Sequence, residues 1–183
     1  MRLDVAVAHG LLASAQARLA RKAHEEIQVA LRQVAAPLER GEDARPLAAE
    51  MIRTMIEGGG IGLAAPQLGV SKRLIVGLHQ SEGWSFVLIN PVITKRDKHR
   101  VWGREGCLSL PGKLVGVRRH KTVTVEGHDV EWKPVRIKAR GLLARVLQHE
   151  IDHLDGRLMT DGEEPDPSRD TRERKLEHVV YET

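Results

Sequence analysis

The chain has 183 residues, enough for one compact domain, and its 41% hydrophobic and 30% charged residues are typical of a soluble protein. No apolar run approaches the roughly 20 residues that span a bilayer, so we expect no membrane partner. The net charge is +4, and only three tryptophans, one tyrosine and one phenylalanine could stack on bases, which argues against a specific nucleic-acid partner. The single cysteine, Cys107, excludes an intramolecular disulfide and fits a reducing compartment.

The first segment is rich in alanine. Residues 1–24 hold only one acidic residue, Asp4, and loosely resemble an organellar transit peptide. Apolar side chains nevertheless recur mostly at three- and four-residue steps, so we favour an amphipathic helix. This stripe comprises Leu12, Ala15, Leu19, Ala23, Ile27, Ala30, Leu31 and Val34.

A second helix and a hairpin are predicted next. Residues 45–57 have helical apolar spacing, and the glycines at 58–60 end the helix. Its apolar face comprises Leu47, Met51, Met55 and Ile56. Residues 73–78 and 84–89 are rich in aliphatic and aromatic side chains, and the Ser-Glu-Gly run at 81–83 joins them as a hairpin.

The later part of the chain predicts a further strand pair. Residues 121–126 alternate valines with polar residues, and residues 132–138 form a partner strand across a turn at 127–129. Two basic clusters, 95–100 and 118–121, are interpreted as solvated charges on loops or edge strands.

Two helices follow the strands. An apolar run with helical spacing begins at Gly141, and Gly156 ends that helix. Pro165 and Pro167 mark a loop, after which residues 168–179 predict a charged helix capped by Ser168. Strands followed by a helix indicate the α+β class.

The most informative motif lies on the helix that begins at Gly141. His149 and His153 stand four residues apart, so their imidazoles lie on one face about one turn apart and can bind one metal ion. Glu150 follows the first histidine and is offset around the helix, where a carboxylate can act on a water molecule. This is the H-E-x-x-H pattern of metallohydrolases.

A catalytic metal site of this kind takes three protein ligands and one open position. Cys107 is the better third ligand, because a metal deprotonates a coordinating thiol and Gly106 frees the backbone beside it. The remaining histidines have no supporting spacing. They are His9, His24, His79, His99, His120, His128 and His178.

Three segments together resemble one family. Residues 60–67 (GIGLAAPQ) match a GxGxAAxQ pattern, residues 105–109 (EGCLS) match EGCxS, and residues 148–155 match QHExDHLD. In these motifs, their order and their spacing, the chain resembles peptide deformylase. The resemblance runs from about residue 27 to residue 160.

The resemblance implies removal of the N-formyl group from the initiator N-formylmethionine of nascent polypeptides, with release of formate. It implies one divalent metal, typically Fe²⁺, with Ni²⁺, Co²⁺ or Zn²⁺ as alternatives. The implied metal ligands are Cys107, His149 and His153. Glu150 is the implied general base and acid, and the Gln67 amide and the Leu108 backbone N–H are implied to stabilise the oxyanion. The implied substrate-binding residues are Gly60, Ile61, Gly62, Leu142 and Val146.

Two acidic residues near these motifs, Glu105 and Asp155, have structural interpretations. Glu105 is expected to anchor its loop by pairing with a base such as Arg119. Asp155 either orients a histidine or is only a polar residue at a helix end.

The expected architecture has antiparallel or mixed β-sheets wrapped around a central helix that carries the HExxH motif, with N-terminal helices and a C-terminal helix. The expected divisions are a helical extension (1–26), a catalytic domain (27–160) and a charged tail (161–183). We expect a cytoplasmic monomer, with an organellar location as the alternative, and the resemblance leaves a weak ribosome association open.

Two other functions remain to be weighed. An HExxH metalloprotease would use the same helix, but Cys107 within EGCxS disfavours it. A non-catalytic metal-binding, ribosome-associated module would close its metal site with a fourth ligand, and Glu150 and Gln67 disfavour that reading.

Overall fold

The computed structural model describes residues 27–165, and the predicted extension 1–26 and helix 168–179 lie outside that part. Residues 27–30 are helical, but the expected helix does not continue to Val34, which is 72% exposed and bridges to Asp155. The chain is extended there because it runs beside the last helix, where the Ala35 N–H donates to the Leu154 carbonyl.

Helix α2 (Arg45–Glu57) has the bounds that the sequence predicts. Met51 and Met55 are fully buried, whereas Ile56 is 55% exposed, so its assignment to the apolar face was wrong. The helix ends in the glycine run, where Gly59 has a φ of +69° and the Gly60 N–H donates to the Met55 carbonyl. This run leads into β1 (Gly62–Ala64) and the short 3-10 helix η1 (Ala65–Leu68).

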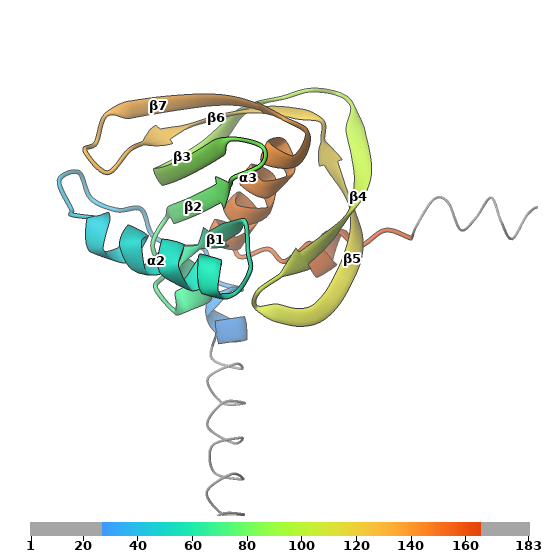
Figure 1. The fold of residues 1–183 in the computed structure, drawn as a ribbon, viewed down its shortest axis with the longest axis horizontal. Helices are drawn as coiled ribbons and strands as arrows, with labels where there is room; N and C mark the ends of the chain where they lie inside the picture. Colours follow the sequence, from blue (N-terminus) through green and yellow to red (C-terminus); the bar gives the residue numbers. More distant parts are fainter. Residues whose placement is uncertain (1–26, 166–183) are drawn as a thin grey trace, which may run out of the picture.

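Five strands form an antiparallel sheet in the order β1-β2-β3-β6-β7 (Figure 1). The predicted hairpin is confirmed as β2 (Leu74–His79) and β3 (Trp84–Arg96), but β3 is longer than expected. It continues past an irregularity between Ile89 and Val92, where Asn90 has a φ of 50° and Pro91 has no N–H to donate. The pairing of β3 with β2 ends at Ile89, whereas its pairing with β6 runs from Ile89 to Arg96.

The second predicted pair is confirmed as β6 (Thr122–His128) and β7 (Pro134–Arg140). The turn lies later than predicted, because the Asp129 carboxylate accepts the backbone N–H groups of Glu131 and Lys133. Trp132 therefore lies in the turn, with a φ of 60°, and not in a strand.

A long hairpin was not predicted. β4 (Arg100–Cys107) and β5 (Leu110–His120) form a separate two-stranded antiparallel sheet, which continues from β3 and leads into β6 (Figure 1). The basic cluster at 118–121 belongs partly to β5, and the side chain of Arg119 is only 11% exposed. For Arg119 the interpretation as a solvated charge was wrong, because it pairs with the buried carboxylate of Glu105 and the partly buried carboxylate of Asp152.

Helix α3 (Gly141–Leu154) carries the HExxH sequence and contacts strands of both sheets (Figure 1). Strand alternation divides the core between the two faces of the five-stranded sheet. Ile75 packs with Leu147 and Ile151 of α3, whereas its neighbours Leu74 and Val76 pack with the methionines of α2. The fold is α+β, and every pairing between named strands in the described part is antiparallel.

Helices α2 and α3 have 13 and 14 residues. Within residues 27–165, no helix is long and apolar enough to cross a membrane.

Candidate active site

A cavity of about 710 Å³ opens between the glycine run after α2, the turn of the β4–β5 hairpin and one face of α3. All but one of the predicted site residues line it. They are Gly60, Ile61, Gly62, Gln67, Cys107, Leu108, Leu142, Val146, His149 and Glu150. The exception, His153, is only 1% exposed and follows His149 by one turn of α3.

Three ligand atoms converge beside this cavity. His149 Nε2 and His153 Nε2 lie 3.2 Å apart, and Cys107 Sγ lies 3.3 Å from His153 Nε2. All three donor atoms lie within 4.8 Å of one another. Ligands of one tetrahedral metal ion, at bond lengths of about 2.0–2.3 Å, are separated by about 3.3–3.7 Å. The donor set therefore fits one metal ion.

The three donors come from local and long-range structure. Helical periodicity alone places His149 one turn from His153. Cys107 is the last residue of β4, where the register of the hairpin shifts after Gly106. This shift ends the strand at the point where the sulfur reaches the histidines of α3.

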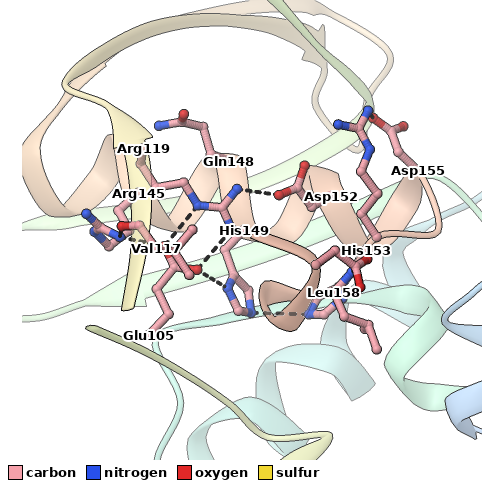
Figure 2. Close-up of polar contacts among 12 residues, drawn as sticks. Glu105, Val117, Arg119, Arg145, Gln148, His149, Asp152, His153, Asp155 and Leu158 are labelled. Carbon is pink, nitrogen blue, oxygen red and sulfur yellow. Dashed lines mark hydrogen bonds and ion pairs between the residues drawn. The ribbon is translucent and has the colours of Figure 1, made fainter. Parts of the chain in front are cut away.

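The carboxylate of Glu105 orients His149. Figure 2 shows Glu105 between His149 and Arg119, and its Oε2 lies 2.9 Å from His149 Nδ1. Arg119 donates to both oxygens of Glu105 at 2.9 Å, which confirms the expected pair, and it also pairs with Asp152 of α3. Arg145 donates to Glu105 Oε1 at 2.7 Å. Because Nδ1 faces a carboxylate, Nε2 is the ring nitrogen that is left to bind a metal.

The charges of this network shift several pKa values. Burial alone would raise the pKa of Glu105, but hydrogen bonds from His149 and Arg119 outweigh it and hold the pKa at about 2. Burial would lower the pKa of His149, yet its hydrogen bonds with Cys107 and Glu105 raise it to about 10. Burial and the nearby His149 lower the pKa of His153 to about 3. Metal binding must therefore displace a proton from this cluster.

Glu150 is buried against strand β1. The residue is 4% exposed, and its Oε2 has no hydrogen-bond partner among residues 27–165. Burial raises the pKa of Glu150 to about 7. A Cβ at Gly62 would lie 2.4 Å from Glu150 Oε1 and 2.8 Å from Val146 Cγ1. Gly62 thus makes room for a carboxylate that is suited to exchange protons near neutral pH.

The amide of Gln67 is held in one orientation. Its Oε1 accepts the Ala64 N–H at 2.8 Å, which leaves its Nε2 to donate to Ser109 Oγ at 3.2 Å and toward Cys107 Sγ at 3.4 Å. The Gln67 donor therefore lies beside the ligand cluster. Leu108 lies in the following turn, and its backbone N–H donates to no acceptor in the part of the chain that the structure describes.

Some residues of the site differ from the sequence interpretation. Asp155 does not orient a histidine: it ends α3 and accepts a hydrogen bond from Arg73 at 2.8 Å. Sequence reasoning missed Arg145, which was counted within an apolar run although its position, three residues after Leu142 and four before His149, places it on the cavity face. It also missed Ser109, which follows Cys107 by two residues and holds Gln67.

Comparisons with known proteins agree with this geometry. The polypeptide deformylase family model matches residues 21–166. The peptide deformylase of Picosynechococcus is 50% identical over 135 residues, which cover 72% of each chain. That of Alkalilimnicola ehrlichii is 44% identical over 153 residues, which cover 82% of this chain and 85% of its own.

Solved structures are similar as well. A peptide deformylase from Synechococcus elongatus in complex with actinonin has a TM-score of 0.71 and 39% identity, covering 82% of this chain and 84% of its own. The peptide deformylase from Thermotoga maritima has a TM-score of 0.70 and 36% identity, covering 74% of this chain and 92% of its own.

Proposed function

This chain belongs to the polypeptide deformylase family, and on that premise we propose that it hydrolyses the N-formyl group of N-formylmethionine at the start of nascent polypeptides and releases formate. The observation that carries the proposal is the convergence of Cys107 Sγ and two histidine Nε2 atoms beside the cavity that Glu150 and Gln67 line. Such a site performs metal-dependent hydrolysis.

Cys107, His149 and His153 would hold one divalent metal ion. When bound, the metal supplies Lewis acidity at the formyl oxygen and makes a coordinated water more acidic. We propose Fe²⁺ as the resident ion, with Ni²⁺, Co²⁺ or Zn²⁺ able to occupy the same ligands, because thiolate and imidazole suit all of them.

Glu150 moves the protons. Its carboxylate takes a proton from the attacking water and later gives it to the departing nitrogen. An amine is too basic to leave unprotonated, so one group must act first as a base and then as an acid. A pKa near 7 and an oxygen without a partner in the described part support both roles.

Gln67 and Leu108 stabilise the negative charge on the formyl oxygen. The Gln67 Nε2 donor is fixed through its own Oε1, and the Leu108 N–H is available at the cavity wall. A prealigned donor of this kind is typically worth about 3 kcal/mol in the transition state. Gly60, Ile61 and Gly62 line the cavity, which supports their assignment to binding of the substrate backbone. Leu142 and Val146 contact the methionine side chain.

The remaining assignments follow from the same premise. We propose residues 27–160 as the catalytic domain, flanked by an extension (1–26) and a charged tail (161–183). A cytoplasmic monomer acting on nascent chains is the proposed state, and a weak ribosome contact would be a property of the full chain.

Two alternatives are less well supported. A metalloprotease needs room for a peptide on both sides of the scissile bond. The family to which this chain belongs is named for deformylation and not for proteolysis. A purely structural metal site would have a fourth protein ligand, whereas the cluster in the described part has three.

The deciding experiment purifies the full chain without oxygen, measures its metal content and assays formyl-Met-Ala, with acetyl-Met-Ala as the matched control. We expect about one metal ion per chain and turnover of the formyl substrate only. Cleavage of internal peptide bonds without deformylation would contradict the proposed function and support a metalloprotease instead.

A further inference from the structure

Arg145 occupies an unexpected place on the cavity face of α3. Leu142, Val146 and His149 line the cavity at helical spacing, and Arg145 lines it among them. Its side chain is only 16% exposed. The two residues assigned to the methionine side chain, Leu142 and Val146, therefore share this face of α3 with a guanidinium.

The β4–β5 hairpin holds this guanidinium in place. Nη1 donates to Glu105 Oε1 at 2.7 Å and to the Val117 carbonyl at 3.0 Å, and Nη2 donates to the Val101 carbonyl at 2.8 Å. A Cβ at Gly103 would lie 2.7 Å from Nη2, so glycine at this position makes room for the arginine. Figure 2 shows Arg145 beside Glu105 and Val117.

The guanidinium keeps hydrogen-bonding capacity. It has five N–H donors and no acceptor. Among residues 27–165 its Nη1 and Nη2 atoms have partners, but Nε donates to none. Arg145 lines the cavity together with Leu142 and Val146, so its guanidinium belongs to the wall that an entering side chain would contact.

We propose that Arg145 extends the substrate range to N-formyl peptides whose first residue is methionine sulfoxide. The inference rests on the proposed deformylase function. The sulfoxide side chain has the length of methionine and adds one neutral oxygen acceptor, which a guanidinium N–H can satisfy. An acidic side chain is a poorer match, because the Arg145 guanidinium already pairs with the carboxylate of Glu105 at 2.7 Å.

The reaction on this substrate is the same hydrolysis. Water adds its hydroxyl to the formyl carbon, the C–N bond breaks, and the nitrogen takes the proton. The sulfoxide is neither oxidised nor reduced. Formate and a peptide with a free amino-terminal methionine sulfoxide are the products.

Norleucine separates hydrogen bonding from shape, because it is nearly isosteric with methionine and has no acceptor. In an apolar pocket, an unpaired sulfoxide oxygen would reduce kcat/KM by roughly tenfold to a hundredfold relative to norleucine. With the Arg145 donor present, we expect the two values to agree within about tenfold, since a hydrogen bond to a charged group offsets that loss.

The experiment uses the full-length, metal-loaded protein and three peptides that differ only in the first residue: formyl-methionine, formyl-norleucine and formyl-methionine sulfoxide. The measured quantity is the sulfoxide-to-norleucine ratio of kcat/KM, which cancels any general loss of activity. Arg145→Leu should lower this ratio at least about tenfold. Arg145→Met, which keeps the length of the stem, serves if the leucine variant does not fold.

Arg100→Leu is the matched control. Arg100 is an exposed arginine of the same hairpin; it donates to the Arg118 carbonyl and does not line the active-site cavity. The sulfoxide-to-norleucine ratio of the Arg100→Leu variant should therefore equal that of the wild type. The inference is overturned if the wild-type ratio is below about one tenth, or if removing Arg145 leaves the ratio unchanged. Both results can occur with full turnover of formyl-methionine, whereas a lack of turnover on every substrate contradicts the deformylase function itself.

Discussion

Replacing Gly62 by alanine should separate the position of Glu150 from its chemistry. The new Cβ would lie 2.4 Å from Glu150 Oε1, whereas ordinary contacts begin near 3.4 Å, so the carboxylate or strand β1 must move by about 1.0 Å. A displacement of about 1 Å in a catalytic group typically costs about a hundredfold in rate. We therefore expect kcat/KM for formyl-Met-Ala to fall by about two orders of magnitude while the metal content stays unchanged.

The cost in stability should be much smaller than the cost in activity. Overpacking a well-packed site typically costs about 1–3 kcal/mol, which lowers the Tm of a domain of this size by roughly 2–12 °C. Gly162→Ala is the matched control, because its Cβ would meet Val117 Cγ1 at an ordinary 3.6 Å. A Gly62→Ala enzyme with a rate within threefold of the wild type would refute the close packing of Glu150 against β1.

Four further outcomes are expected. Glu150→Gln should retain the metal and lose at least about a hundredfold in kcat; full metal content with a normal rate would contradict its role in proton transfer. Cys107→Ser should weaken metal retention, measured by metal analysis after dialysis, and a variant that binds metal equally well would point to another third ligand. Formyl-Met peptides should exceed formyl-Ala peptides in kcat/KM, since each lost methylene costs about 1 kcal/mol, and equal rates would mean that no apolar pocket holds the side chain. Because the pKa of Glu105 is lowered from 4.5 to about 2, its contribution to the free energy of unfolding should be complete above about pH 4.5 and lost as the pH falls through 2. Glu105→Gln should lack that pH dependence in acid-unfolding experiments, and identical curves would exclude the contribution.

Local patterns alone predicted several elements of this protein. Helical periodicity and the glycines after it define α2 to the residue, because each depends only on neighbours within about one turn. The i, i+4 spacing of His149 and His153 puts both imidazoles on one face of a helix whatever the rest of the fold does. The three short motifs then identify the family, although no single one of them does so alone.

Tertiary structure decided what depends on residues far apart in the chain. Whether Arg119 is solvated or buried depends on Glu105 and Asp152, which lie 14 and 33 residues away. The β4–β5 hairpin was missed because its basic and glycine-rich strands lack the apolar alternation by which a strand is recognised. In the sequence, Arg145 is one charged residue within an apolar run. Only the folded structure brings it to the carbonyls of β4 and β5, which hold it in the cavity wall. Sequence periodicity reports which face a side chain is on, but the partner that covers that face is set by the packing of distant segments.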